Sequence, residues 1–377
     1  MSAPPFWDLA WLVHRHFPVQ EERVRDGVPE FTVLAPPDLE ERFEALRAEL
    51  APRGQLPLLR HRDGVMVLRV VPRPFSARSR PWVHILLFLA TVATTFATGY
   101  IGSQRFSDLL QRMPGAVLRL GYVPNPLRDG LLFSAGLLAI LLVHEMGHKI
   151  AARVHGIDAS WPYFIPFPPV ILGQVSIGTM GAVIVTREPA PSRNALFDLG
   201  ASGPLAGMLV AIPLLLIGLT RTVVLDLRQV LPHLAGLPAF PFPWSVARLL
   251  EWRFGSGPNL LYYTDPITDA AVIGLFVTGI NLLPASMLDG GHAVRALLGP
   301  RWHRITSYLA VVLLVLLGLI PMALLLLFLT ARGHPGPAND VSPPSPGRVA
   351  VGLLLLLIFL LALPLDYLLL PLRLLSP

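Results

Sequence analysis

Cysteine is absent from this chain of 377 residues, and lysine occurs only once, at Lys149. Without cysteine, disulfide bonds, thiol nucleophiles and thiolate metal ligands are excluded, so a bound metal ion must be held by nitrogen and oxygen atoms. Charged residues are also scarce, at 14% of the chain. No basic cluster interleaved with aromatic residues occurs, so the sequence predicts no nucleic-acid partner.

Apolar residues dominate instead. They make up 53% of the chain, and the mean hydropathy is +0.59, which is typical of a protein embedded in a lipid bilayer. A transmembrane helix needs about 20 mostly apolar residues. The sequence predicts a mainly α, polytopic membrane protein with about six transmembrane helices, over residues 82–101, 131–153, 195–219, 268–285, 304–330 and 349–371.

The second apolar run carries three ionisable side chains within five positions, His144, Glu145 and His148. A charge at the centre of a membrane costs about 2.5–3.5 kcal/mol on insertion scales, so such residues are functional by default. Residues i and i+4 share one face of a helix, so both histidines can bind one metal ion while Glu145 acts on a water molecule there. The alternative is that neighbouring helices satisfy two buried histidines with hydrogen bonds.

A second motif, NLLPASMLDGGH, covers residues 281–292 and follows the fourth apolar run. Its Asp289 offers a carboxylate. A catalytic zinc site uses three protein ligands and one open position, which two histidines and one carboxylate supply. Taken alone, Asp289 could also be a turn or helix-capping residue before Gly290 and Gly291.

With both motifs in view, the chain resembles the site-2 protease family of intramembrane zinc metalloproteases, over roughly residues 82–300. The resemblance implies Zn²⁺ held by His144, His148 and Asp289, with Glu145 as the catalytic base. It implies substrates that are single-span membrane proteins cut within their transmembrane segments. The loop 220–266 is too short for a PDZ module, so the resemblance is to the branch that lacks one. The motifs that carry it are HExxH at 144–148, Asn281-x-x-Pro284, Leu288-Asp289-Gly290 and FDLGASGPLAG at 197–207.

Other residues of these motifs keep two interpretations each. Asn281 is a candidate catalytic residue that holds the substrate or stabilises an oxyanion, or it makes an interhelical hydrogen bond. Pro284 either turns Asp289 inward beside the substrate or is a plain kink. His292 is either a partner of the metal site or an interfacial residue. Gly203 and Gly207 are typical of close helix packing.

Residues 1–76 predict a small soluble α+β domain, ahead of the metalloprotease core at 82–300 and two additional C-terminal transmembrane helices at 301–377. The elements expected in the small domain are helices at 6–16 and 38–50, a strand at 31–34, and a hairpin of 56–62 with 65–71 that turns at Asp63-Gly64.

The segment 156–194 is too rich in proline and glycine to cross a membrane as a helix. Within it, Gly173–Thr186 predicts a re-entrant β-hairpin with a turn at Thr179-Met180, because non-helical backbone at membrane depth must line a cavity. We expect this hairpin to bind an unwound substrate as an added strand. The expected substrate-binding residues are Gly178, Gly181, Val183, Val185 and Pro284.

Arginines favour a cytoplasmic N-terminus. Arg73, Arg78 and Arg80 precede the first run, and positive residues gather on the cytoplasmic side. The prediction is a multi-pass protein of a prokaryotic cytoplasmic membrane; the oligomeric state stays open. Two other functions also stay open, a divalent-metal transporter and a proteolytically inactive scaffold, although no internal repeat typical of transporters is found and Glu145 is intact.

Overall fold

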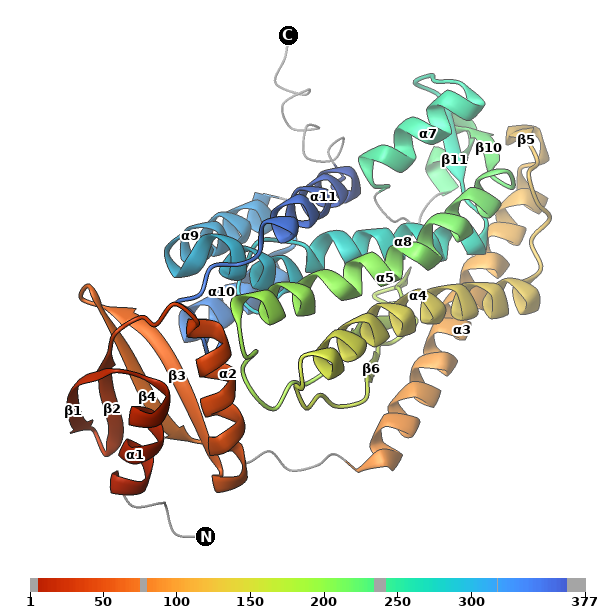
Figure 1. Ribbon diagram of the computed structural model, residues 1–377. Helices are drawn as coiled ribbons and strands as arrows, with labels where there is room; N and C mark the ends of the chain where they lie inside the picture. The colour runs from red at the N-terminus through yellow and green to blue at the C-terminus, as the bar shows by residue number, and fades with distance from the viewer. Residues whose placement is uncertain (1–5, 75–79, 234–241, 317, 365–377) are drawn as a thin grey trace.

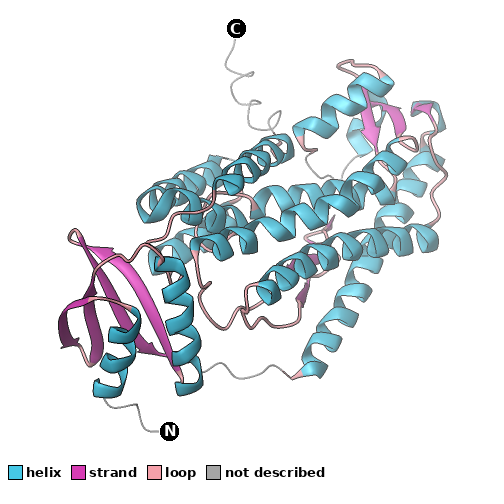
Figure 2. Ribbon diagram, in the orientation of Figure 1, coloured by secondary structure: helices cyan, strands magenta, loops and turns pink. Residues whose placement is uncertain are grey.

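The computed structural model describes residues 6–74, 80–233, 242–316 and 318–364 of the chain. Figure 1 shows a small sheet domain at the N-terminus beside a larger assembly of helices, and Figure 2 shows that helix dominates that assembly. The prediction of a mainly helical protein with a small N-terminal α+β unit is confirmed.

The N-terminal domain is a four-stranded antiparallel sheet in the order β1-β2-β4-β3, covered by two helices. The side chains of Phe17, Phe31, Phe43 and Leu68 are fully buried in its core. The elements are α1 (Phe6–His16), β1 (Val19–Arg25), β2 (Val28–Val33), α2 (Leu39–Leu50), η1 (Ala51–Arg53), β3 (Gln55–Arg62) and β4 (Val65–Pro72).

Both hairpins of this sheet turn at an Asp-Gly pair in the left-handed region. Asp63 and Gly64 have φ of 50° and 84°, and Asp26 and Gly27 have φ of 52° and 75°, which suits two-residue hairpin turns. The turn at Asp63-Gly64 is the one expected from the sequence. The turn at Asp26-Gly27 was not expected, and neither was β1, because β1 is an edge strand whose exposed residues show no apolar alternation.

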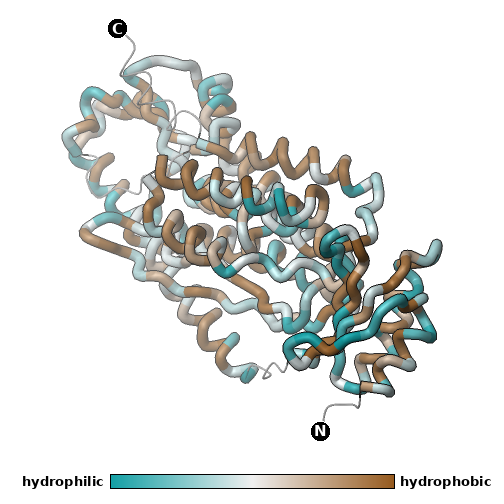
Figure 3. Tube along the Cα trace, turned by 90° about the vertical axis from the view of Figure 1, so that its left-hand side faces the viewer, coloured by the Kyte–Doolittle hydropathy of each residue, from teal (hydrophilic) through white to brown (hydrophobic). Residues whose placement is uncertain are grey.

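Three helices are long and apolar enough to cross a membrane: α3 (Pro81–Arg112), α4 (Pro126–Val154) and α5 (Arg193–Leu219). They correspond to the first three expected spans. Three further apolar helices are shorter, α8 (Pro266–Asn281), α10 (Ile320–Arg332) and α11 (Pro346–Ala362). Figure 3 shows hydrophobic residues predominating along the helices and hydrophilic ones gathering in the N-terminal domain.

The expected span 304–330 is wrong as a single helix. Residues 304–316 belong to α9 (Asp289–Leu316), which bends at Gly299, and the chain then starts a separate helix, α10, that packs back against α9. Gly318 has φ of 73° and Pro321 lies in the first turn of α10. A glycine in the left-handed region and a proline in a first turn both separate two helices, and a count of apolar residues does not detect them. The end of the last expected span, 365–371, lies outside the described residues.

Helices α3, α4 and α5 pack through small residues. A Cβ at Gly99 would lie 2.7 Å from the Phe133 side chain on α4, and one at Gly147 would lie 2.5 Å from the Ser202 carbonyl oxygen on α5. Such contacts let backbones approach closely where no hydrophobic effect drives association. Helix α4 therefore lies between its two neighbours, and α5 also packs against α8 and α9.

The segment between α4 and α5 forms two small antiparallel pairs: β6 (Tyr163–Pro166) with β9 (Thr179–Val183), and β7 (Val170–Ile171) with β8 (Gln174–Val175). The expected turn at Thr179-Met180 is wrong, because both residues lie in β9. The tight turn is at Leu172-Gly173, where φ is 48° and 81°. Gly178 instead fits against α3, where a Cβ would lie 2.5 Å from Thr98 Oγ1.

A second sheet unit lies at the opposite end of the helices from the N-terminal domain (Figure 1), in loops for which no elements were expected. Its strands follow the order β11-β10-β5. The elements are η2 (Pro114–Ala116), β5 (Val117–Arg119), β10 (Val223–Asp226), α6 (Leu227–Val230), η3 (Leu231–His233), α7 (Trp244–Phe254) and β11 (Leu260–Tyr263).

The loop between α10 and α11 joins the N-terminal domain to the helices. The backbone of Leu59 on β3 donates to Ala338 (2.8 Å) and accepts from Asp340 (3.2 Å). Ala338 is fully buried within the core of the N-terminal domain. Asp340 also receives two hydrogen bonds from Arg295 of α9, at 2.9 and 2.6 Å. The loop is therefore part of both units.

Candidate metal centre

Helix α4 places the two histidines of the first motif on one face. The helix begins at Pro126, where the side chain of Asn125 accepts a hydrogen bond from the Arg128 backbone, a typical helix start. His144 and His148 are then one turn apart, and both are buried at about 5% exposure in the face that packs on α5.

The nitrogen and oxygen atoms of three side chains converge on one point. His144 Nε2 lies 3.2 Å from Asp289 Oδ2, and His148 Nε2 lies 3.3 Å from Asp289 Oδ1. The two Nε2 atoms are 3.1 Å apart. Zinc–ligand bonds of about 2.0–2.1 Å in a tetrahedron place neighbouring ligand atoms about 3.3 Å apart. The spacing of these three side chains therefore fits a zinc ion.

The protonation of His148 also fits a metal ligand. Its Nδ1–H donates to the carbonyl oxygen of Leu199 on α5, at 2.6 Å. A neutral imidazole that donates from Nδ1 has its lone pair on Nε2, the atom that faces Asp289. A backbone carbonyl in this position is a common orienting partner of a metal-bound histidine.

Two glycines of α5 make room for the imidazole rings. A Cβ at Gly203 would lie 2.1 Å from His148 Nε2, and a Cβ at Gly207 would lie 3.3 Å from the His144 ring. The sequence predicted these glycines as helix-packing residues. They do allow close packing, and the groups that pack against them are the two histidine rings.

Asp289 reaches the histidines because the chain turns sharply before it. Helix α8 ends at Asn281 and α9 begins at Asp289. A Cβ at Gly290 would lie 2.0 Å from the Leu282 carbonyl oxygen, and one at Gly291 would lie 2.4 Å from that of Ala285. Only glycine fits at both positions, so the Gly-Gly pair after Asp289 permits the tight turn that aims its carboxylate at α4.

Glu145 and Asn281 flank the three convergent side chains. The backbone of Ile184, just beyond β9, lies near the Glu145 carboxylate. His144, Glu145 and His148 can all bring a ligand atom within 4.8 Å of one another. Asn281 Nδ2 lies 3.5 Å from His144 Nε2, a weak contact that leaves its amide available.

A cavity of about 360 Å³ opens beside these groups. Val183 and Val185 line it and are each about half exposed. Of the other expected substrate-binding residues, Gly178, Gly181 and Pro284 do not line it. Asn281 and His292 do, and the complete lining is His144, Glu145, His148, Ala182, Val183, Ile184, Val185, Thr186, Leu199, Asn281, Met287, Leu288, Asp289 and His292.

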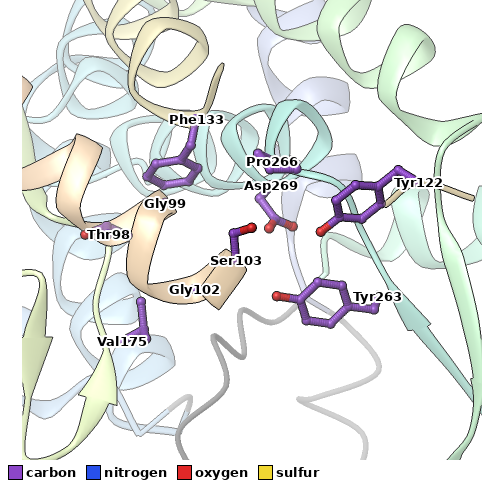
Figure 4. Close-up of a pocket in the computed structure, with 10 residues that line it drawn as sticks. All are labelled: Thr98, Gly99, Gly102, Ser103, Tyr122, Phe133, Val175, Tyr263, Pro266 and Asp269. Carbon is purple, nitrogen blue, oxygen red and sulfur yellow. The ribbon is translucent and has the colours of Figure 1, made fainter. Parts of the chain in front are cut away.

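Figure 4 shows a second cavity, at the opposite end of α3 and α4, with Ser103, Tyr122, Tyr263 and Asp269 around it. Its volume is about 20 Å³, enough for about one water molecule. The Asp269 carboxylate already accepts a hydrogen bond from Thr264. This cavity is too small for a peptide, so the cavity beside His144 is the candidate site.

Comparison with known proteins agrees with the geometry. "Probable zinc metalloprotease EGY1, chloroplastic" from Arabidopsis thaliana is 29% identical over 304 residues, which is 75% of this chain and 53% of the relative. "Probable zinc metalloprotease EGY2, chloroplastic" from Oryza sativa subsp. indica is 30% identical over 240 residues, or 62% of this chain and 42% of the relative. The chain spans about half the length of the curated relatives it matches. No solved structure is detectably similar.

Residues 132–325 match the sequence pattern of "Peptidase family M50". This match covers slightly more than half of the chain and contains every residue of the convergent site, from His144 to Asp289. The chain therefore belongs to Peptidase family M50.

Proposed function

We propose that this chain is an intramembrane zinc metalloendopeptidase that cleaves single-span membrane proteins within their transmembrane segments. The observation that carries the proposal is the convergence of His144, His148 and Asp289 beside Glu145 in a cavity large enough for an extended peptide. His144, His148 and Asp289 would hold the zinc ion. The names of the plant relatives support zinc and proteolysis for those proteins.

Zinc, when bound, polarises the scissile carbonyl and lowers the pKa of water. Glu145 then accepts the proton of the attacking water and passes it to the leaving amine. Glu145 and Ile184 both line the cavity. Asn281 lines the same cavity and has an amide N–H to offer to the substrate.

We propose that the metal site faces the same side of the membrane as the N-terminal domain. Helices α3 and α4 are antiparallel, and Thr95 Oγ1 lies 2.7 Å from Ser134 Oγ. Continuing this register brings Glu145 level with His84, which is in the first turn of α3. The N-terminal domain precedes that end of α3. With the arginines before α3, this side would be cytoplasmic.

The segment 163–186 would be re-entrant and would present the substrate strand. Thr94 Oγ1 in the middle of α3 donates to the Gly178 carbonyl (2.7 Å), and Arg105 donates to that of Gly173 (2.8 Å). These contacts support a segment that reaches from one end of α3 deep along its length. Polar backbone at that depth needs protein partners.

The strand edge available to a substrate follows from the directions in which the peptide groups of residues 184–186 point. Val185 donates its N–H to Ser160 Oγ and accepts from Ser160 N–H, each at 3.0 Å. The peptide group of Val185 is thus paired within the protein, so Val185 would meet a substrate only through its side chain, which lines the cavity. Successive residues of a strand direct their peptide groups to opposite edges. The peptide groups of Ile184 and Thr186 therefore point to the opposite edge, and both residues line the cavity that contains Glu145.

The experiment that tests this function compares the membrane proteomes of cells carrying the wild-type chain and Glu145→Gln. A single-span protein that accumulates in full length with the variant, and that the purified wild type cleaves in detergent, is the expected result. If the purified protein moves a divalent ion across vesicles and cleaves nothing, the chain is a transporter. If it does neither while holding zinc, it is a scaffold.

A further inference from the structure

His292, the last residue of the second motif, is paired with a histidine that no sequence motif contains. His292 Nδ1 lies 2.9 Å from Nε2 of His334, which belongs to the loop between α10 and α11. The two rings meet edge to face at 85°, with centroids 5.1 Å apart. The ring of His303 lies 5.1 Å from that of His334 on another side. The sequence offered no signal for this pairing, because it joins residues 42 positions apart.

A backbone contact decides which nitrogens carry protons. The N–H of Gly336 donates to His334 Nδ1, at 2.8 Å. A backbone N–H can only donate, so His334 Nδ1 is the acceptor and the proton of this neutral ring is on Nε2. His334 Nε2–H then donates to His292 Nδ1. By the same reasoning, the proton of His292 is on its own Nε2.

The same contact argues against a second metal site in this cluster. A histidine ligand needs a free lone pair on the coordinating nitrogen. His148 has one, because its Nδ1 donates to a carbonyl and Nε2 is free. His334 has the reverse arrangement, with Nδ1 accepting and Nε2 protonated. Burial lowers the pKa of His334 to about 2, which agrees with a neutral ring.

His292 itself lines the catalytic cavity. It lies one helical turn after Asp289 on α9, and its Cβ faces Gly200 of α5. Its Nδ1 edge is occupied by His334, so the edge that carries Nε2–H is the one left for the cavity. Among the described residues, Nε2 of His292 has no hydrogen-bond acceptor. His292 therefore lines the cavity and has one ring N–H for which no described residue is an acceptor.

We propose that His292 donates its Nε2–H to the carbonyl oxygen of the scissile peptide bond, where negative charge develops, and that His334 is a positioning residue that fixes this tautomer. The proposal rests on the proposed function, because it needs a peptide in the cavity. A preorganised donor of this kind typically contributes about 10²–10³-fold to kcat.

The loop that carries His334 is held from outside the membrane helices. Arg60 of β3 donates to the carbonyl oxygens of Pro335 (3.1 Å) and Ala338 (2.8 Å). Ala338 is itself buried in the core of the N-terminal domain, and Asp340 is bound by Arg295 of α9. The tautomer of His292 thus depends on a loop that the N-terminal domain keeps in place.

The first test reads the tautomer and needs no activity. The full-length chain is labelled with [¹⁵N]histidine, loaded with zinc in detergent, and studied by long-range ¹H–¹⁵N correlation, with His292→Gln and His334→Gln used for assignment. The expected result is an unprotonated Nδ1 and a protonated Nε2 at His292, and loss of this single form in His334→Leu. A protonated Nδ1 at His292 in the wild type overturns the proposal.

The second test measures kinetics with a detergent-solubilised single-span peptide as probe. His292→Leu should lower kcat about 10²–10³-fold, with KM and zinc content close to wild type. His292→Gln, whose amide can reach the position of Nε2, should recover part of the loss. His61→Gln, at an exposed site on β3, is the matched control.

The outcomes separate this proposal from the function on which it rests. Unchanged kcat in His292→Leu overturns the donor role, and loss of zinc in that variant does so too, because it makes His292 a metal-holding residue. If wild type and Glu145→Gln are both inert while zinc is bound, the proposed function fails. The tautomer measurement still decides whether His334 positions His292.

Discussion

His144 Nε2 lies 3.2 Å from Asp289 Oδ2, although 145 residues separate the two in sequence. Two helix packings create this contact. Helix α5 accepts the histidine rings of α4 over its glycines, and α9 begins with its aspartate beside α5. The carboxylate and the two imidazoles thus come from two helices, α9 and α4, that both pack against α5.

Removal of a ligand should remove the metal. We expect purified wild-type protein to hold about one zinc ion per chain, and His148→Ala or Asp289→Ala to lose most of it. Glu145→Gln should retain the metal and lose cleavage, because Glu145 is assigned as base. Metal analysis after tag removal is the measurement. Equal zinc content in all four proteins would exclude this site, and zinc loss in Glu145→Gln alone would make Glu145 the carboxylate ligand in place of Asp289.

Gly203 should tolerate no side chain. In Gly203→Ala the added methyl group would lie 2.1 Å from His148 Nε2, so the ring must move away from Asp289. We expect zinc affinity to fall at least about 10-fold, as for other changes that misorient a ligand. Gly207→Ala, with a nearest approach of 3.3 Å, is the control and should bind zinc nearly as the wild type does. Competition with a chromogenic chelator measures both, and equal affinities would show that the close approach does not constrain the ring.

The cavity-facing edge of the strand should be sensitive to proline. Thr186→Pro removes a backbone donor on the edge shared with Ile184. We expect strongly reduced cleavage with unchanged zinc content, because Thr186 is not among the three proposed zinc ligands. Thr186→Ala changes the same side chain, keeps the backbone donor and serves as the control. Normal cleavage by Thr186→Pro would mean that the substrate does not pair with this edge.

The ion pair between Arg295 and Asp340 should stabilise the docked loop. Both side chains are largely buried, at 5% and 11% exposure. Asp340→Asn leaves Arg295 without its partner anion, and breaking a buried pair in this way typically costs about 3–5 kcal/mol. A urea titration followed by tryptophan fluorescence should show an earlier transition. Asp38→Asn, in an exposed pair with Arg42, should leave the transition where it is; equal midpoints for both variants would contradict the prediction.

The N-terminal domain should lose stability in acid through Glu30. Burial raises the pKa of this carboxyl group, but the hydrogen bond and charge of Arg23, with the charges of Arg69 and Arg62, outweigh it and leave the pKa lowered. A lowered folded pKa means stability that is present above the unfolded value of about 4.3 and lost as pH falls through the folded value. Glu30→Gln should therefore be less stable than wild type at pH 7 and show a weaker acid dependence. Glu41→Gln, on the exposed face of α2, should match wild type. If Glu30→Gln lost stability at low pH just as the wild type does, Glu30 would not be the group responsible.

Sequence periodicity was sufficient where local rules decide the structure. The helix 6–16, the helix before Leu50 and the turn at Asp63-Gly64 depend on neighbours in the chain, and all three are confirmed. The sharing of one helix face by His144 and His148 is also local. Asp289 could be joined to them only through a family motif, because three-dimensional proximity leaves no spacing signal.

Errors arose where one residue type serves several purposes. Gly178 was expected to bind substrate, yet it does not line the cavity, and its lack of a Cβ allows close contact with α3. Residues 304–330 are apolar enough to span a membrane, but Gly318 and Pro321 split them. The role of His334 could not be predicted from the sequence. Nothing in the loop indicates that His334 pairs with His292, or that the N–H of Gly336 sets its tautomer.

The insertion of Ala338 into the N-terminal core has a consequence for biosynthesis. At about 5–20 residues per second, the roughly 265 residues between Pro72 and Ala338 take about 13 to 53 s to synthesise. During that time the domain made first lacks part of its interior, and His334 has not yet been made. The N-terminal domain would therefore complete its core, and His292 would gain its partner His334, only after the helices that carry His144, His148 and Asp289 have been made.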